Sequence, residues 1–124
     1  MGSDSLPFYY VQIAPFNYSK SKGEKVLNEH TEPEFWEAQA QLLRLPNTGM
    51  VVTTDLNDSG EDLHPTYKWE VGRRLSLLAL GKTYAQNIVY SGPIFTKIKL
   101  LMSSVRLKFD HLQYLVSKDF NQFT

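Results

Sequence analysis

Two short apolar runs, separated by a segment with helical periodicity, constrain the fold of this chain more than any other feature. The first run, residues 8–14, is rich in aromatic and β-branched residues with little alternation, which is typical of a strand covered on both faces. The second run, residues 50–54, is also mostly apolar. Because a helix is predicted between them, we expect two parallel strands joined by a right-handed crossover.

The helix between these strands is predicted to begin at Thr31, which has the parts of a capping box with Glu34. In this motif the Thr31 hydroxyl accepts from the amide of Glu34, and the Glu34 carboxylate accepts from the amide of Thr31. Apolar residues recur at helical spacing and predict the inward face of the helix: Phe35, Ala38, Leu42 and Leu45. The turn at residues 46–49 ends the helix.

A second helix is predicted to start at His64 and Pro65, because proline fits the first turn of a helix, where its missing N–H costs nothing. Its predicted inward stripe fades near Gly81 and consists of Tyr67, Val71, Leu75 and Leu78. The order strand, helix, strand, helix is typical of a parallel α/β unit.

After the break at residues 91–93 the apolar period changes to two. Ile94, Thr96, Ile98 and Leu100 alternate with Phe95, Lys97 and Lys99, and a second alternating run contains Val105, Leu107 and Phe109. This pattern predicts an antiparallel hairpin. Residues 112–124 close no recognisable unit, so we expect the chain to stop within a domain.

The charge balance argues against nucleic acid or a membrane as partner. The 124 residues include 13 lysines and arginines and 13 aspartates and glutamates, scattered along the chain, for a formal net charge of zero. No apolar run approaches the roughly 18 residues that span a bilayer. The absence of cysteine excludes disulfides and thiolate chemistry, and the three histidines lack metal-ligand spacing. We therefore expect neither a metal nor another cofactor, and any nucleophile must be an oxygen.

His64 is the candidate functional residue, because the loop that carries it leaves the carboxyl end of the second strand, where open parallel sheets bind ligands. Glu61 and Asp62 lie three and two residues before it. Either carboxylate can accept from the ring N–H, fix its tautomer and stabilise the imidazolium, which is half of a hydrolytic triad. The competing interpretation is a surface histidine beside acids that suit the helix dipole.

A serine nucleophile is not evident, because the sequence contains no G-x-S-x-G turn. Serines occur in predicted turns, where the residue is common for conformational reasons: Ser59, Ser91, Ser103 and Ser104.

Two further sets of residues lie close to the predicted site. Gln12 and Asp55 are at or near strand ends, where they can contact it. Arg73 and Arg74 are interpreted as helix-surface charges, one of which can pair with Glu70.

Six segments between residues 6 and 110 occur in the same order as in bacterial sialate O-acetylesterases, which belong to the SGNH hydrolase superfamily. They are FYYVQIAPF at 8–16, FWEAQ at 35–39, LPNTGMVVTTD at 45–55, DLHP at 62–65, VGRRL at 71–75 and YSGP at 90–93. The chain resembles the carboxyl-terminal part of the catalytic module of these esterases.

The resemblance implies an α/β fold: part of a three-layer α/β/α flavodoxin-like sheet over residues 6–92, then a β-hairpin that starts a β-rich segment over residues 93–124. It implies a serine esterase that removes O-acetyl groups from sialic acid or a related acetylated sugar, with His64 as general base. The superfamily acid has the spacing of Glu61, whereas Asp62 is one residue nearer. Such relatives are usually exported, to the periplasm or outside the cell.

The blocks that carry the serine, glycine and asparagine of the superfamily lie upstream in these esterases and are absent from this sequence. We therefore expect a fragment that is inactive alone and whose partner is the missing upstream half of the module. The alternative is a non-catalytic truncated product, or a remnant that binds carbohydrate or a partner. A nucleotide-binding domain has only the architecture in its favour, because no glycine-rich phosphate loop is present.

Overall fold

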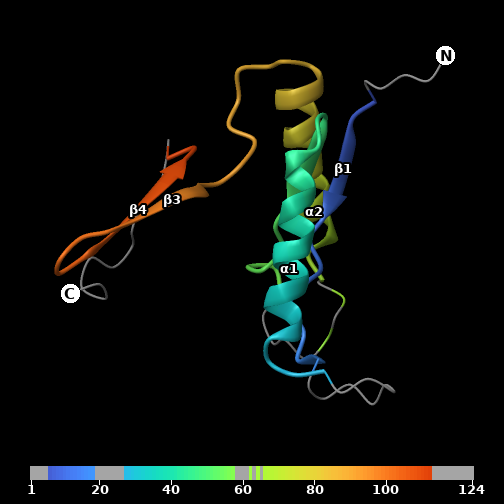
Figure 1. The fold of residues 1–124 in the computed structure, drawn as a ribbon. Coiled ribbons are helices and arrows are strands. Elements are labelled where there is room, and N and C mark those ends of the chain that lie inside the picture. Colours follow the sequence, from blue (N-terminus) through green and yellow to red (C-terminus); the bar gives the residue numbers. More distant parts are fainter. Residues whose placement is uncertain (1–5, 19–26, 58–61, 63, 65, 113–124) are drawn as a thin grey trace.

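The computed structural model describes residues 6–18, 27–57, 62, 64 and 66–112. In chain order the elements are β1 (Phe8–Val11), α1 (Thr31–Gln41), the 3-10 helix η2 (Leu42–Arg44), β2 (Thr48–Val51), α2 (Lys68–Leu78), the π-helical η3 (Ala79–Thr83), β3 (Ile94–Leu100) and β4 (Val105–Asp110). Together they form a small mixed α/β structure in which the β3–β4 hairpin stands apart from the helices (Figure 1). Within the described ranges, no helix is long and apolar enough to cross a membrane.

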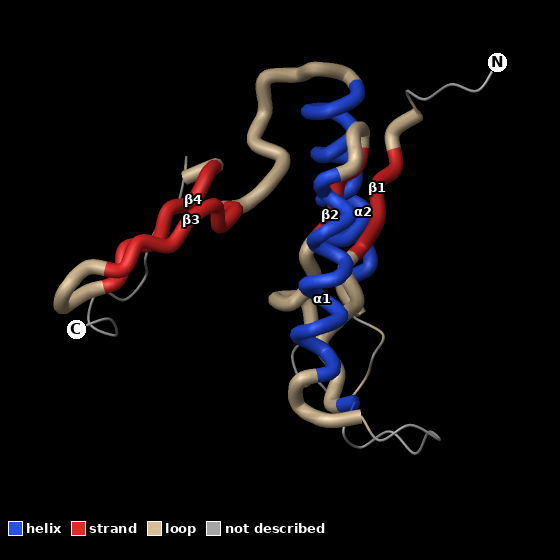
Figure 2. Tube along the Cα trace, viewed as in Figure 1, coloured by secondary structure: helices blue, strands red, loops and turns tan. Residues whose placement is uncertain are grey.

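Strands β1 and β2 are parallel, as the sequence predicts. They pair from Phe8 opposite Thr48 to Val11 opposite Val51, and the amide of Gln12 donates to the carbonyl of Val51 at 2.8 Å, one residue beyond β1. Helix α1 is the crossover between the two strands, and Figure 2 shows the pair beside α1 and α2. The prediction of a strand buried on both faces is wrong for β1, since Phe8 is 61% exposed.

The buried core is small and lies where α2 packs on the parallel strands. Val51 of β2 and Leu78 of α2 are each 3% exposed, which confirms Leu78 as an inward residue of the second helix. Thr53 is 1% exposed and donates its hydroxyl to the carbonyl of Gln12 at 3.0 Å. This bond continues the strand pairing where the backbone ladder ends, because the hydroxyl replaces a ladder amide as the donor.

Two cations hold the side of β2 that faces away from β1. Lys82 Nζ donates to the carbonyl of Thr48 at 2.5 Å, and Arg74 Nη1 donates to the carbonyl of Val52 at 2.8 Å. Carbonyls on this side have no partner strand within the described residues. The α2–η3 segment is therefore fastened to both ends of β2.

The predicted inward stripe of α1 is wrong, because Phe35 is 50% and Leu45 is 56% exposed, and Ala38 and Leu42 are exposed as well. Side chains of α1 that hydrogen-bond to the segment after β1 include Trp36 and Gln39. The indole N–H of Trp36 donates to the carbonyl of Ile13, and Gln39 Oε1 accepts from the amide of Ile13, both at 2.9 Å. Hydrogen bonds to the backbone beyond β1, and not the apolar period, set the orientation of α1.

Helix α1 begins at Thr31 as predicted, but the capping box with Glu34 does not form. No side chain caps this terminus, because Thr31 is already in the helix and His30 takes the N-cap position. Asn28 supplies the local bonds instead: its Oδ1 accepts from the amide of His30 at 2.9 Å, and its amide donates to the Thr31 hydroxyl at 3.1 Å.

Helix α2 begins at Lys68, so the predicted start at His64 is wrong, and Pro65 lies outside the described residues. The amide of His64 donates to the side chain of Asp62 at 2.8 Å. Such a local side-chain bond offers the backbone an alternative to the helix. Tyr67, the first residue of the predicted stripe, is 49% exposed at the N-cap.

The predicted hairpin is confirmed, since β3 and β4 pair in an antiparallel sheet. The strict alternation of β3 fails at one point, because the register shifts between Phe95 and Lys97. Phe95 lies opposite Phe109, and Lys97 lies opposite Lys108. The bulge places Phe95 on the face away from Lys97, with its ring 5.9 Å from that of Phe109 in an edge-to-face arrangement.

Gly49 of β2 provides a stability test, because a Cβ there would lie 2.9 Å from Cδ1 of Tyr9 and 3.4 Å from Cδ2 of Leu78. The Tyr9 ring is itself held, since its hydroxyl is 2.7 Å from the Thr83 hydroxyl. We expect Gly49→Ala to lower the free energy of unfolding by about 1–3 kcal/mol, as overpacking does.

Gly72 of α2 is the matched control, because a Cβ there meets nothing within 4 Å. Gly72→Ala should raise the free energy of unfolding by about 0.5–1 kcal/mol through helix propensity. Urea unfolding of both variants checks the pair, and shifts of the same sign would contradict the packing of Tyr9 on β2.

Candidate functional site

The loop between β2 and α2 carries a histidine–carboxylate pair. Nδ1 of His64 lies 3.0 Å from Oδ1 of Asp62, and the same oxygen accepts from the His64 backbone amide at 2.8 Å. The backbone bond first, and then the ring bond, hold the pKa of Asp62 below its ordinary value. Because an ionised carboxylate only accepts, Nδ1 carries the hydrogen, and Nε2 is the basic nitrogen of the neutral ring.

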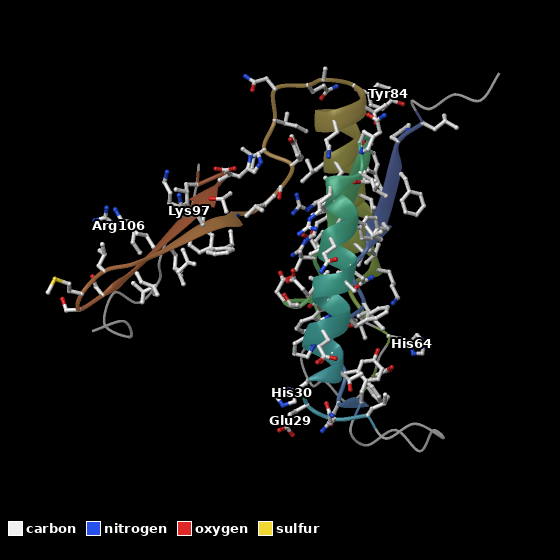
Figure 3. The ribbon with its side chains drawn as sticks, in the orientation of Figure 1. Glu29, His30, His64, Tyr84, Lys97 and Arg106 are labelled. Carbon is white, nitrogen blue, oxygen red and sulfur yellow. The ribbon has the colours of Figure 1, made fainter. Side chains whose placement is uncertain are left out.

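Both side chains are open to solvent, with 75% of the His64 side chain and 70% of the Asp62 side chain exposed. Figure 3 shows His64 projecting outward from the loop that precedes α2. Within the described residues, the ring has a hydrogen-bond partner in Asp62 and nowhere else. The ring is therefore accessible to a group that approaches from outside the described structure.

Of the two candidate acids, the structure brings Asp62 to the ring. Glu61 lies outside the described residues, so its predicted contact with His64 stays a prediction. The Asp62 carboxylate closes a local turn by accepting from the His64 backbone amide. This turn places the same oxygen beside Nδ1, although the two residues are only two apart in sequence.

Asn57 ties this loop to the segment after β1, a role that the sequence does not reveal. Its Nδ2 donates to the carbonyl of Pro15 at 2.5 Å and to the carbonyl of Asp62 at 2.7 Å. A primary amide has two N–H donors, so one nitrogen can hold both carbonyls. Pro15 is 42 residues away in sequence, and no local pattern predicts so distant a contact.

Arg74 fixes the carboxyl end of β2, where the loop starts. Its Nη1 and Nη2 donate to the two carboxylate oxygens of Asp55 at 2.7 and 2.6 Å, and its Nε donates to Oε1 of Glu70 at 2.8 Å. These bonds lower the pKa of Asp55 and raise that of Arg74. The interpretation of Arg74 as a surface charge is wrong, since its side chain is only 25% exposed and bridges strand end and helix.

The predicted pairing with Glu70 is confirmed, and Glu70 serves both arginines. Arg73 donates from Nε to Oε2 at 2.7 Å and from Nη2 to Oε1 at 2.8 Å. The Glu70 side chain is 12% exposed, and the two guanidinium groups lower its pKa from 4.5 to about 2.

The two strand-end residues predicted to lie near the site do not hydrogen-bond to His64 within the described structure. Asp55 is held by Arg74. Gln12 is 8% exposed, and its side-chain oxygen Oε1 is buried without a hydrogen-bond partner there. Gln12 follows β1 and Asp55 follows β2, so both lie at the end of the sheet from which the His64 loop departs.

Comparison with known proteins identifies one informative relative among solved structures. The chain is similar to the crystal structure of a carbohydrate acetylesterase from Xanthomonas citri, with 38% sequence identity and a TM-score of 0.73 over 86% of this chain. The match covers 23% of that protein, so the present chain spans less than a quarter of its length. No protein-family model and no curated protein match the chain.

The bridge made by Arg74 can be tested against the exposed pair made by its neighbour. Arg74→Met should lower the free energy of unfolding by about 1–2 kcal/mol, because it removes charged hydrogen bonds to Asp55, Glu70 and the Val52 carbonyl. Arg73→Met removes an i,i+3 pair whose arginine is 53% exposed, and should lower the free energy of unfolding much less. Equal effects in urea unfolding would contradict the bridging role.

The pKa of Glu70 predicts how stability depends on pH. The folded pKa of about 2 is below the ordinary 4.5, so ionised Glu70 stabilises the fold above pH 4.5. That stabilisation is lost as the pH falls from about 4.5 toward 2. We expect the melting temperature to fall over this range, and to fall less in Glu70→Gln. A variant that keeps the full wild-type slope would show that Glu70 does not carry the effect.

Proposed function

We propose that this chain is the histidine-bearing part of a carboxylic ester hydrolase that removes acetyl groups from an acetylated sugar. The similarity to a carbohydrate acetylesterase over 86% of the chain is the observation that carries the proposal. The His64–Asp62 pair on the loop after a parallel strand supports it, because hydrolytic sites of α/β proteins lie at such strand ends.

We further propose an SGNH-type arrangement, with residues 6–92 as the carboxyl-terminal part of a three-layer flavodoxin-like catalytic domain and residues 93–124 as the start of a β-rich segment. Successive residues of β1 bond to different helices, which supports this layering: the Tyr10 hydroxyl reaches α1 at 2.6 Å, and the Tyr9 hydroxyl reaches η3 at 2.7 Å. Sialic acid is the proposed acetylated sugar, and a periplasmic or secreted location belongs to the same proposal.

In the proposed mechanism, His64 Nε2 removes the proton from a serine hydroxyl as the serine oxygen attacks the acetyl carbonyl. Asp62 positions the ring through Nδ1 and stabilises the imidazolium that forms. As the tetrahedral intermediate collapses, the imidazolium returns the proton to the sugar oxygen that leaves. Water then hydrolyses the acetyl-enzyme with His64 again as the base. We assign the acid role to Asp62 in preference to Glu61, because the Asp62 contact is in place.

The serine and the donors that stabilise the oxyanion are proposed to lie in the part of the esterase that the match does not cover. The exposure of His64 fits such a composite site, since a buried ring would be closed to a group from another segment.

The test is a chimera in which residues of this chain replace the matched segment of the Xanthomonas citri esterase. We expect acetate release from an aryl acetate and from an O-acetylated sugar. His64→Ala should lower kcat by on the order of 10⁴ to 10⁶, and Asp62→Asn by about 10² to 10⁴. Losses of this size would show that the variants impair proton transfer by the His64 ring.

His30→Ala is the matched control, because His30 is also 75% exposed and lies 3.9 Å from an acid, Glu29. It should leave kcat unchanged. Full activity of the His64→Ala chimera would overturn the assignment of the base. A folded chimera that is inactive even with His64 present would favour the non-catalytic alternative, a remnant that binds carbohydrate or a partner.

A further inference from the structure

The β3–β4 hairpin gathers four cations on one face. Lys97 lies directly opposite Lys108, and Lys99 lies directly opposite Arg106. Directly paired residues share a face of a sheet, and so do alternate residues along a strand. These four side chains, here termed the basic face, therefore project from the same side of the hairpin (Figure 3 labels Lys97 and Arg106).

The other side of the hairpin is apolar and contains Phe95, Ile98, Leu100, Val105, Leu107 and Phe109. The bulge after Phe95 produces this separation, because it moves Phe95 away from the side of Lys97 and onto the side of Phe109. The apolar side chains and the four cations thus lie on opposite faces, and no aromatic ring lies among the cations.

The basic face carries four cations beside a single acid and is therefore net positive within the described structure. None of its four residues forms a salt bridge there, although like charges directly opposite each other destabilise a strand pair. The nearest acid on the hairpin is Asp110, which lies two residues after Lys108 on the same face of β4 and forms no salt bridge with the four cations in the described structure. In a chain with a formal net charge of zero, this is a concentration of positive charge that an anion would relieve.

An open, shallow hollow lies between the four side chains, and its surface is formed almost wholly by their aliphatic stems. Its volume is about 200 Å³, and its lining consists of Lys97, Lys99, Arg106 and Lys108. The two cationic pairs follow one another at a spacing of about 7 Å along the strands. This spacing suits an extended ligand with repeated anionic groups better than a single small anion.

We propose that the basic face binds a polysaccharide that carries carboxylates along its length. The choice of a polysaccharide rests on the proposed function, an esterase of acetylated sugars; the choice of an anionic ligand rests on the hairpin alone. Lysine and arginine bind carboxylates through charge-assisted hydrogen bonds. The site would hold the acidic substrate polymer away from the ester that is cleaved.

Nucleic acid and membrane fit the hairpin less well. Single-stranded nucleic acid is held by aromatic rings beside cations, and the phenylalanines lie on the opposite face. A membrane surface binds apolar side chains and cations on one side of an element, whereas here a bilayer that contacts one face would leave the other in water.

The test measures binding of the 124-residue chain to polygalacturonate at low salt, without an activity readout, so that it can fail independently of the esterase proposal. We expect Lys97→Gln with Lys108→Gln to weaken binding about tenfold or more. Fully methyl-esterified polygalacturonate, which has the same sugar without the charge, should not bind. Added salt should weaken binding of the wild-type chain.

Arg44→Gln with Lys68→Gln is the matched control, because it removes the same charge from exposed positions outside the hairpin, and it should change affinity less than twofold. The hairpin variant should melt no lower than wild type, since it removes a repulsive pair. Equal loss in both double variants, equal binding of the methyl ester, or tighter binding of a single-stranded RNA oligonucleotide would each overturn the proposal.

Discussion

The guanidinium of Arg74 links the carboxyl end of β2 to α2, and the geometry of the candidate site depends on this link. It joins the Val52 carbonyl and the Asp55 carboxylate at the end of β2 to Glu70 on α2. A parallel pair of four-residue strands offers little buried surface, and charged hydrogen bonds supply rigidity that apolar contacts cannot. Because the loop with the histidine runs from this strand end to this helix, Arg74 also fixes both ends of the candidate site.

The sequence predicted those features that repeat or that lie close together along the chain. Apolar runs predicted the parallel strands, and alternation predicted the hairpin, since both patterns reflect the extended backbone and pleat of a strand. They did not predict burial, because Phe8 of β1 and most residues of β3 and β4 are exposed. The acid neighbours predicted a carboxylate at His64, and Asp62 is in contact. The apolar period predicted the wrong face of α1. The helix is oriented by hydrogen bonds from Trp36 and Gln39 to the backbone of Ile13, and such polar contacts leave no periodic signal in the sequence.

The remaining features depend on partners far apart in sequence. Asn57 reaches Pro15 across 42 residues, and Arg74 reaches Asp55 across 19 residues. Neither residue differs in type from many other polar residues of the chain, so only the folded arrangement distinguishes them. The bulge after Phe95 was also not predictable from the sequence. One extra residue in β3 moves Phe95 to the face opposite Lys97, and so separates the apolar side chains from the cations.

The central claim is that Asp62 holds the ring of His64 with the hydrogen on Nδ1 and leaves Nε2 as the unprotonated nitrogen of the neutral ring. Nitrogen-15 NMR of the two ring nitrogens measures this directly in the 124-residue chain at a pH where the ring is neutral. The structure predicts a protonated Nδ1 and an unprotonated Nε2, with this preference lost in Asp62→Asn. A ring that carries its hydrogen on Nε2, or a tautomer balance that Asp62→Asn does not change, would contradict the claim.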